Sequence, residues 1–483
     1  MRKLLTNLFQ LLRTNSWAFL MFVSLNFFVD STSKYLILTI ITVLSLYLLN
    51  KNLSKTIWLS IIFLGFFNKA RYFPLDYYGD YFQKIFNDLS LINAQASIHN
   101  SFLYISFLDP LIFLLIYLLR FKDSTFGKIR FKAGVLDLAI LILIILSFVS
   151  CILSPLIGLA SFYFWIFFKY ILLFYLARIF SQDQEIKKDL FEIILIFTLI
   201  FSSIIILQKI SGGSLGLIVE DSLGEKFADE NRSLYRPGGF FHDSNLAASI
   251  LLFFLPLNSF LISSKKKVIE ILAQVGIILS LLAIFFTMSR AIWFCLLLIM
   301  LINFNTIKKS LKKIWKKLRS KEKYLLIAAT LVLTPYFLFF SLNRMSSLFV
   351  KKNSGDNTLK YRLRHFKNTG YYLKNNLFGL GHNVLKFKII NDLKPEAFSY
   401  DPTASHNLFL EITNALGPFG LIAFLYFLKE LFLKSKKRKS TLKTKMLSLS
   451  LISYLLVAQF YPWLYEFRIS AFFWIIAGTY YEE

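Results

Sequence analysis

The chain has little of the chemistry by which many proteins bind metals or form disulfides. Its 483 residues include two cysteines, Cys151 and Cys295, and both lie in apolar runs. The sequence therefore predicts neither a disulfide framework nor a CxxC metal site. The five histidines lack metal-ligand spacing. Phosphate-binding loops, dinucleotide fingerprints and GxSxG nucleophile elbows are also missing. We expect no metal and no cofactor.

Acidic residues are scarce as well, with 28 Asp and Glu against 55 Lys and Arg and a formal net charge of +27. Such an excess suggests nucleic acid, but the hydropathy favours another explanation. Hydrophobic residues make up 56% of the chain, 54 of them Phe, and the mean hydropathy is +0.58. The apolar residues form long blocks of membrane-spanning length. The sequence predicts an all-α polytopic membrane protein that does not bind nucleic acid.

The apolar blocks predict 12 to 14 transmembrane helices, the short runs at the start being the least regular. No small-residue cleavage site follows the first run, so we expect a retained span rather than a signal peptide. The spans are predicted near residues 17–29, 35–49, 56–69, 102–119, 135–152, 160–178, 189–208, 246–262, 268–287, 290–304, 324–341, 407–430, 446–462 and 469–481.

The basic residues predict the orientation, because Lys and Arg gather on the cytoplasmic side of membrane proteins. The densest clusters, Lys308–Lys323 and Lys434–Lys445, lie inside if the N-terminus is inside. Three long external segments follow, near 70–101, 209–245 and 342–406. We therefore divide the chain into transmembrane helices over 1–341, a large, partly helical external loop over 342–406 and C-terminal transmembrane helices over 407–483.

Arg236 lies in an external segment, Tyr235–Asn245, in which Pro237-Gly238-Gly239 allows a sharp turn. Asn245 is predicted to cap the helix that follows. An arginine beside a helix N-terminus makes a natural anion site. The alternative is a basic loop that touches lipid headgroups.

Arg290 is the one charge in a long apolar stretch, within Phe285–Trp293. An ionisable group embedded in this way is costly unless it faces a polar cavity or a partner. It falls on the same predicted side as Arg236. The alternative is a tight hairpin from which the arginine snorkels to the interface.

The third external segment ends in Ser405-His406-Asn407, at the start of the next apolar helix. A neutral imidazole can accept a proton from a hydroxyl nucleophile near pH 7, whereas Ser405 and Asn407 suit a helix cap. Glu411, further along the helix, would orient His406 or pair with a loop cation. A helix predicted over Asn357–Asn376 carries Arg362 and Arg364, which would hold phosphates or form a solvated basic face.

These residues resemble the O-antigen ligase and O-antigen polymerase superfamily in their order and placement. The resemblance covers roughly residues 130 to 480. It rests on Arg236 to Asn245, on Ser289-Arg290-Ala291, and on Ser405-His406-Asn407-Leu408 before Gly417-Pro418-Phe419-Gly420. The family often has Pro-Asn where this chain has Ser244-Asn245.

The resemblance implies a GT-C-like fold and a metal-independent, inverting glycosyl transfer at the periplasmic face of the bacterial inner membrane. The donor would be a glycan on polyprenyl (undecaprenyl) diphosphate. By the same resemblance, His406 activates the acceptor hydroxyl, and Arg236 and Arg290 bind the diphosphate. Further candidates for substrate binding are Asn245, Arg362, Arg364, Asn407 and Glu411.

Two acceptors are compatible with this reading. A ligase uses lipid A-core, in lipopolysaccharide biosynthesis, and a polymerase uses another lipid-linked repeat unit, with a chain-length regulator as a candidate partner. Arg344 to Gly355 fits a polymerase pattern once, which chance also produces. The single dominant loop before the histidine favours the ligase. A lipid-linked sugar transporter or flippase is a further alternative, although the chain lacks the internal repeats typical of that class.

Overall fold

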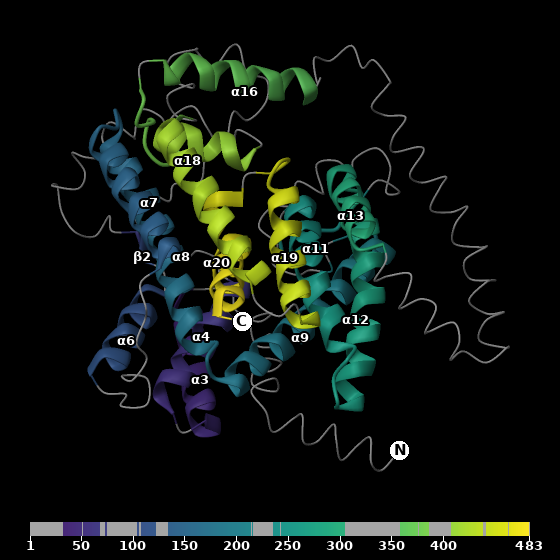
Figure 1. The fold of residues 1–483 in the computed structure, drawn as a ribbon. Helices are drawn as coiled ribbons and strands as arrows, with labels where there is room; N and C mark the ends of the chain where they lie inside the picture. Colours follow the sequence, from purple (N-terminus) through teal and green to yellow (C-terminus); the bar gives the residue numbers. More distant parts are fainter. Residues whose placement is uncertain are drawn as a thin grey trace.

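A computed structural model describes residues 32–50, 52–67, 73–74, 104–105, 108–121, 134–213, 215, 235–241, 243–304, 358–374, 376–385, 407–437, 441–461 and 463–482. The described chain is almost entirely helical (Figure 1). One two-stranded antiparallel ladder joins β1 (Phe73–Pro74) to β2 (Tyr104–Ile105). The helices are α3 (Thr32–Asn50), α4 (Leu53–Phe67), α6 (Leu108–Phe121), α7 (Val135–Ile152), α8 (Ile157–Phe180), α9 (Gln184–Ser211), α11 (Ser244–Leu261), α12 (Lys267–Phe286), α13 (Arg290–Ile302), α16 (Thr358–Leu373), α18 (Leu408–Lys437), α19 (Leu442–Val457), the 3₁₀ helix η4 (Trp463–Tyr465) and α20 (Phe467–Glu482).

Six of the described helices are long and apolar enough to cross a membrane: α7, α8, α9, α11, α12 and α18. All six overlap predicted spans, and α7 has the predicted bounds. The fold class is therefore confirmed as an all-α polytopic membrane protein. The spans predicted at 17–29 and 324–341 lie outside the described residues. The total of 12 to 14 spans stays a prediction.

Neighbouring helices pack in pairs along their lengths: α8 with α20, α9 with α12, α7 with α18 and α11 with α19. Buried hydroxyls and amides form hydrogen bonds both between these pairs and within them. Asn258 Nδ2 donates to Thr198 Oγ1 at 2.8 Å, and Ser450 Oγ donates to the Phe253 carbonyl at 2.6 Å. Such bonds stabilise membrane bundles by about 0.6–2 kcal/mol each, because lipid offers polar groups no other partner.

The outward faces of α7, α12 and α13 carry exposed apolar side chains, among them Leu138, Phe148, Ile278, Leu297 and Leu301. Exposed leucine and isoleucine in such number would be unfavourable in water but match lipid tails. These three helices therefore present the lipid-facing surface expected of outer helices in a membrane bundle.

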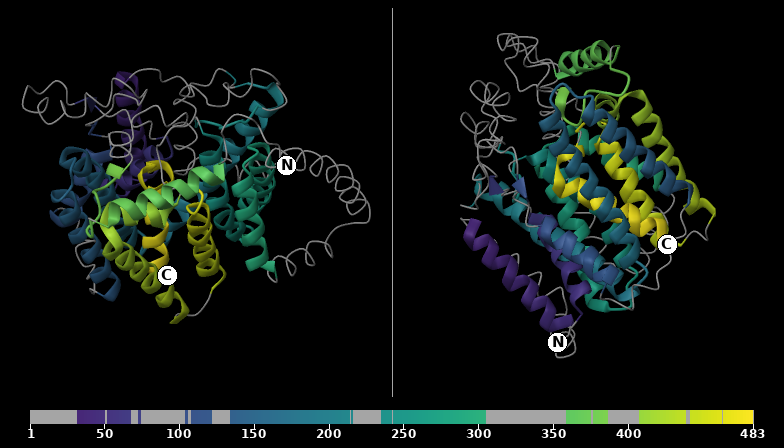
Figure 2. Two further views of the ribbon diagram at one scale, coloured as in Figure 1. Left: turned by 90° about the horizontal axis from the view of Figure 1, so that it is seen from above. Right: turned by 90° about the vertical axis from the view of Figure 1, so that its left-hand side faces the viewer.

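Short turns reverse the chain between α7 and α8 and between α12 and α13, so the two helices of each of these pairs run antiparallel. The contacts described below join four parts of the structure at one end of the bundle. These are the turn Thr287–Ser289, the segment 235–241 and the starts of α18 and α20. We call this the arginine end of the bundle. Helix α16 lies across the arginine end and contacts α18 (Figures 1 and 2).

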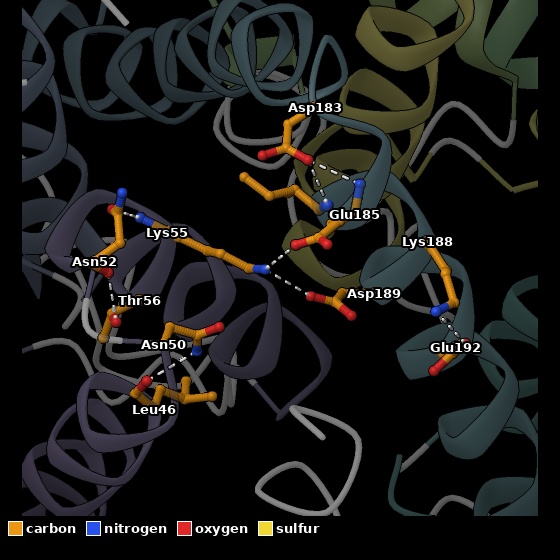
Figure 3. A network of polar contacts seen from close by, with 11 residues as sticks. Leu46, Asn50, Asn52, Lys55, Thr56, Asp183, Glu185, Lys188, Asp189 and Glu192 are labelled. Carbon is orange, nitrogen blue, oxygen red and sulfur yellow. Dashed lines mark hydrogen bonds and ion pairs between the residues drawn. The ribbon is translucent and has the colours of Figure 1, made fainter. Parts of the chain in front are cut away.

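Ion pairs hold the opposite end together. Arg178 is buried and bonds to Asp137 at 2.6 Å and Glu482 at 2.8 Å, which joins α8 to α7 and α20. Lys55 reaches Asp189 at 3.2 Å, which joins α4 to α9 (Figure 3). A buried cation needs such compensation, since removing one partner would leave an unpaired charge in a low-dielectric interior.

Helix α18 is broken at Gly417, whose φ of 71° and ψ of −176° are not helical. Pro418 follows and has no N–H to offer to the carbonyl of Asn414, four residues earlier. The segment Leu377–Leu385 supplies the missing donors. Leu380 N–H donates to the Asn414 carbonyl at 2.8 Å, and Gly381 N–H donates to the Ala415 carbonyl at 3.2 Å. The break in α18 is thus the docking point of the segment that precedes it.

Candidate functional site

Arg236 is fixed by two hydrogen bonds that join the segment 235–241 to two helices. Its Nε donates to the Thr287 carbonyl at 3.0 Å, in the turn between α12 and α13. Its Nη2 donates to Asn245 Oδ1 at 2.9 Å, in the first turn of α11. The guanidinium is therefore held between the end of α12 and the start of α11.

The prediction that Asn245 caps α11 is wrong. Asp243 is the N-cap, and its carboxylate accepts the Asn245 N–H at 2.7 Å. Ser244 and Asn245 belong to α11 itself and not to its cap. The Asn245 side chain therefore accepts a hydrogen bond from Arg236 instead of capping the helix. A carboxylate is also a stronger acceptor for free backbone N–H groups than an amide, because it is charged.

Helix α9 holds the backbone of the segment 235–241 in place. Gln208 Oε1 accepts the Gly239 N–H and Gln208 Nε2 donates to the Gly239 carbonyl, both at 2.8 Å. Gly239 has a φ of +67°, and a Cβ there would collide with the ring of Phe201. Phe240 stacks on that same ring, with centroids 5.5 Å apart. These contacts fix the backbone of the segment 235–241, and its turn requires glycine at position 239.

Arg290 is the first residue of α13, directly after the turn Thr287–Ser289. Trp293 stabilises this turn by stacking on Phe285 at 5.1 Å, and its Nε1 donates to the Ile284 carbonyl at 3.2 Å. Because Arg236 binds the carbonyl of Thr287, the two arginines meet at one turn. The sequence places them 54 positions apart.

The pKa of Arg236 reflects the nearby charge of Arg290. Burial lowers the pKa of its guanidinium below the usual value, and repulsion from Arg290 adds to the shift, whereas Tyr461 and Asp243 oppose it. Tyr461 also interacts electrostatically with Arg290. Arginine remains protonated near neutrality even when its pKa falls somewhat. The arginine end therefore holds two positive charges within electrostatic range of each other, a favourable place for an anion of two or more charges.

A third arginine, Arg468, reaches the same segment and was missed by the sequence analysis. It lies in the first turn of α20 with its Cζ 4.8 Å from the ring centroid of Phe241. Its Nε donates to Glu466 Oε1 at 2.6 Å. The signal was an arginine directly before an apolar span, the same feature that singled out Arg290.

Asn407 caps α18, as predicted: its Oδ1 accepts the N–H groups of Phe409 at 2.9 Å and Leu410 at 3.1 Å. Its Nδ2 donates to Gln459 Oε1 at 3.0 Å. The Leu408 N–H donates to the Ala458 carbonyl at 2.7 Å. The start of α18 is thereby tied to the end of α19, two residues before Tyr461.

His406 and Ser405 lie outside the described residues. Arg362 and Arg364 belong to α16, which occupies Thr358–Leu373 where a helix is predicted, but their side chains are outside the described part. Glu411 is buried in the first turn of α18 and interacts electrostatically with Tyr163 and Tyr465.

A buried histidine, His382, lies in the segment Leu377–Leu385. Its Nδ1 shares a hydrogen bond of 2.9 Å with the Tyr465 hydroxyl, and its ring packs 5.1 Å from that of Phe167. Burial lowers the pKa of His382 to about 3, so the imidazole is neutral near pH 7. Its role here is to dock the segment onto α8 and η4. In the described ranges, no three His, Cys, Asp or Glu side chains gather closely enough to hold a metal ion.

Part of the chain matches a known protein family. Residues 275–425 match the family model described as O-antigen ligase. This part of the chain is therefore an O-antigen ligase domain. The matched part contains Arg290, Asn407 and Glu411. Arg236 lies outside it but bonds to Thr287 within it. Arg468 lies outside it as well and contacts Phe241 of the segment 235–241. No curated protein matches the chain.

The match supports ligase- or polymerase-type activity in surface polysaccharide synthesis, with a lipid-linked glycan donor and a glycan acceptor. The helices match a multi-pass membrane location.

Proposed function

We propose that the protein is an O-antigen ligase that moves a glycan from polyprenyl (undecaprenyl) diphosphate to a sugar hydroxyl of lipid A-core. The observation that carries the proposal is the meeting of Arg236 and Arg290 at the turn Thr287–Ser289. Two guanidiniums side by side suit a diphosphate, which carries two phosphoryl groups joined by one oxygen.

The reaction is a single displacement that needs no metal. The acceptor oxygen forms a bond to the anomeric carbon while the bond from that carbon to the diphosphate oxygen breaks. The electron pair leaves with the polyprenyl diphosphate, and the acceptor proton passes to His406. Attack from the face opposite the leaving group inverts the anomeric configuration. Arg236 and Arg290 stabilise the negative charge that grows on the diphosphate, as fixed cations do in a preorganised site.

The tether at the start of α18 supports the role of His406. Asn407, the next residue, bonds to Gln459, and Tyr461 lies two residues beyond in electrostatic range of both arginines. The backbone that follows His406, at Asn407, therefore lies at the arginine end. We assign Asn245 to positioning Arg236, and Asn407 and Glu411 to positioning the start of α18. Arg362 and Arg364 are assigned to phosphate contact from α16.

The proposed site faces the periplasm, in the inner membrane of a bacterium. The positive clusters Lys308–Lys323 and Lys434–Lys445 support this orientation, because they follow α13 and α18 away from the arginine end. The ligase assignment is supported by the description of the matching family model.

The test is the surface glycan of cells that carry His406→Ala in place of the native chain. We expect normal membrane levels of the protein and loss of glycan transfer by about a hundredfold or more, because general base catalysis contributes on that order. Normal long-chain glycan in this variant would remove His406 from the mechanism.

Deletion of the whole chain separates ligase from polymerase. A ligase deletion accumulates polymerised chains on polyprenyl diphosphate, whereas a polymerase deletion leaves single repeat units on the core. Single units would overturn the ligase assignment while keeping the same donor, and unchanged glycan would overturn both.

A further inference from the structure

A cavity of about 250 Å³ opens at the end of the bundle opposite the arginines. It lies between the start of α9, the turn from α11 to α12 and the start of α19, so four helices contribute to its walls. Its lining includes Lys188, Glu192, Phe191, Phe260, Ser264 and Lys443. We call it the lysine cavity. Nothing in the proposed glycan transfer uses it.

The charge around the lysine cavity is mainly positive. Lys188 and Lys266 each lie 3.8 Å from Glu192 Oε1, and Figure 3 shows the pair of Lys188 and Glu192 on α9. Lys443 enters from α19 and lies 5.6 Å from the ring centroid of Phe191. Two ammonium groups thus flank the Glu192 carboxylate, and a third, that of Lys443, lies in the cavity lining. The next acid on α9, Asp189, bonds to Lys55 instead.

The Glu192 carboxylate is buried. Its Oε1 has no hydrogen-bond donor among the described residues, since both lysines stand beyond hydrogen-bond distance. Lys188 and Lys266 are half-exposed, so their ammonium groups retain donors for a second anion. The single negative charge of Glu192 orders Lys188 and Lys266 but does not neutralise both of them.

One wall of the lysine cavity is apolar. The rings of Phe191 and Phe260 lie 5.8 Å apart, and Leu261 and Ile269 extend the same surface. The lining also includes Ser263 and Ser264 in the turn between α11 and α12. The cavity therefore offers cations and hydroxyls next to hydrocarbon, at the ends of membrane-spanning helices.

We propose that the lysine cavity binds the headgroup of an anionic membrane phospholipid. Its phosphate contacts Lys188 and Lys443, and its glycerol and upper acyl carbons lie on Phe191 and Phe260. Basic pockets between transmembrane helices recognise anionic lipids in this way, because the phosphate sits at the depth where the helices end. The volume is below the roughly 300–1,000 Å³ of drug-sized ligand sites, which matches a headgroup whose chains remain in the bilayer.

The experiment uses the full chain, purified in detergent and stripped of lipid, and titrates it with phosphatidylglycerol while native mass spectrometry counts bound lipids. We expect one tight phosphatidylglycerol per chain and weaker phosphatidylcholine binding. Lys188→Gln with Lys443→Gln should weaken this binding about tenfold. Lys443→Gln alone, which leaves the pair of Lys188 and Glu192 intact, should weaken it about threefold.

The matched control is Lys265→Gln with Lys267→Gln, which removes the same charge from the neighbouring surface outside the cavity. Equal weakening by the two double variants would overturn the proposal, because only overall charge would matter. Displacement of phosphatidylglycerol by an equal concentration of inorganic phosphate would overturn it too, by assigning the cavity to a soluble phosphate.

Discussion

Single side chains at the arginine end show why residue type matters more than charge there. Arg236 uses two nitrogens of one planar group to reach a carbonyl on one helix and an amide on another. Lysine offers a point charge on a flexible stem and cannot reproduce that fork. Asn245 owes its place in this arrangement to Asp243, which takes over the capping of α11.

Arg290→Lys is the direct residue-scale test. We expect glycan transfer to fall by about tenfold or more, because a lost charge-assisted hydrogen bond costs about 1.5–3 kcal/mol. The measurement is transfer rate against donor concentration with the purified protein. The control exchange is Lys267→Arg at the opposite end, where Lys267 forms an exposed pair with Glu270. Full activity of the Arg290 variant would identify a snorkelling residue.

His382 gives a pH prediction. Its pKa is about 3 in the folded chain, against about 6.5 in an unfolded one. As the pH falls below 6.5, the unfolded state takes up a proton that the folded state does not, so stability declines on acidification. We expect a loss of about 2 kcal/mol between pH 7 and pH 5 from this residue.

His382→Phe should remove that acid sensitivity, because a phenyl ring fits beside Phe167 and does not titrate. Thermal unfolding in detergent at pH 7 and pH 5 measures the difference. An equal fall in the unfolding temperature of wild type and variant would contradict the assignment.

Among the elements, α18 and the segment Leu377–Leu385 form one unit. The break at Gly417 and Pro418 frees carbonyls of α18, and Leu380 and Gly381 donate to them. Ser150 Oγ on α7 also donates to the Ala415 carbonyl, at 2.5 Å. The sequence contained both glycine motifs, but their pairing could not be predicted, since nothing local links residues separated by about thirty positions.

Gly417→Ala should be destabilising by about 3 kcal/mol or more. Its φ and ψ lie in a region that only glycine enters readily, and a Cβ would collide with the carbonyl of Leu377. The measurement is the thermal unfolding temperature in detergent. Gly370→Ala in α16 is the matched control, because a Cβ there meets nothing within 4 Å. An unchanged temperature for the Gly417 variant would mean that the break is not required.

For the whole molecule, the two ends of the bundle have different chemistry. The arginine end gathers Arg236, Arg290 and Arg468 around one turn and one segment. The opposite end holds carboxylate-paired cations and the lysine cavity. The orientation proposed from the positive-inside rule puts the opposite end in the cytoplasm.

Cysteine labelling tests this orientation. In a chain whose Cys151 and Cys295 are replaced by serine, Ser354→Cys should react with an impermeant thiol reagent added to intact cells. Ser263→Cys, in the turn between α11 and α12, should react only after permeabilisation. The reverse pattern would overturn the orientation and the periplasmic site with it.

The sequence by itself determined the membrane class and the helices, because runs of apolar residues must be buried in lipid wherever they fold. It also singled out Arg236, which lies in a glycine turn beside a helix start, and Arg290, since a lone charge in an apolar run is costly. Only the contacts between helices bring these two arginines to one turn and place Arg468 beside the same segment. Those outcomes depend on which helix ends pack together, and local periodicity carries no information on contacts between distant segments.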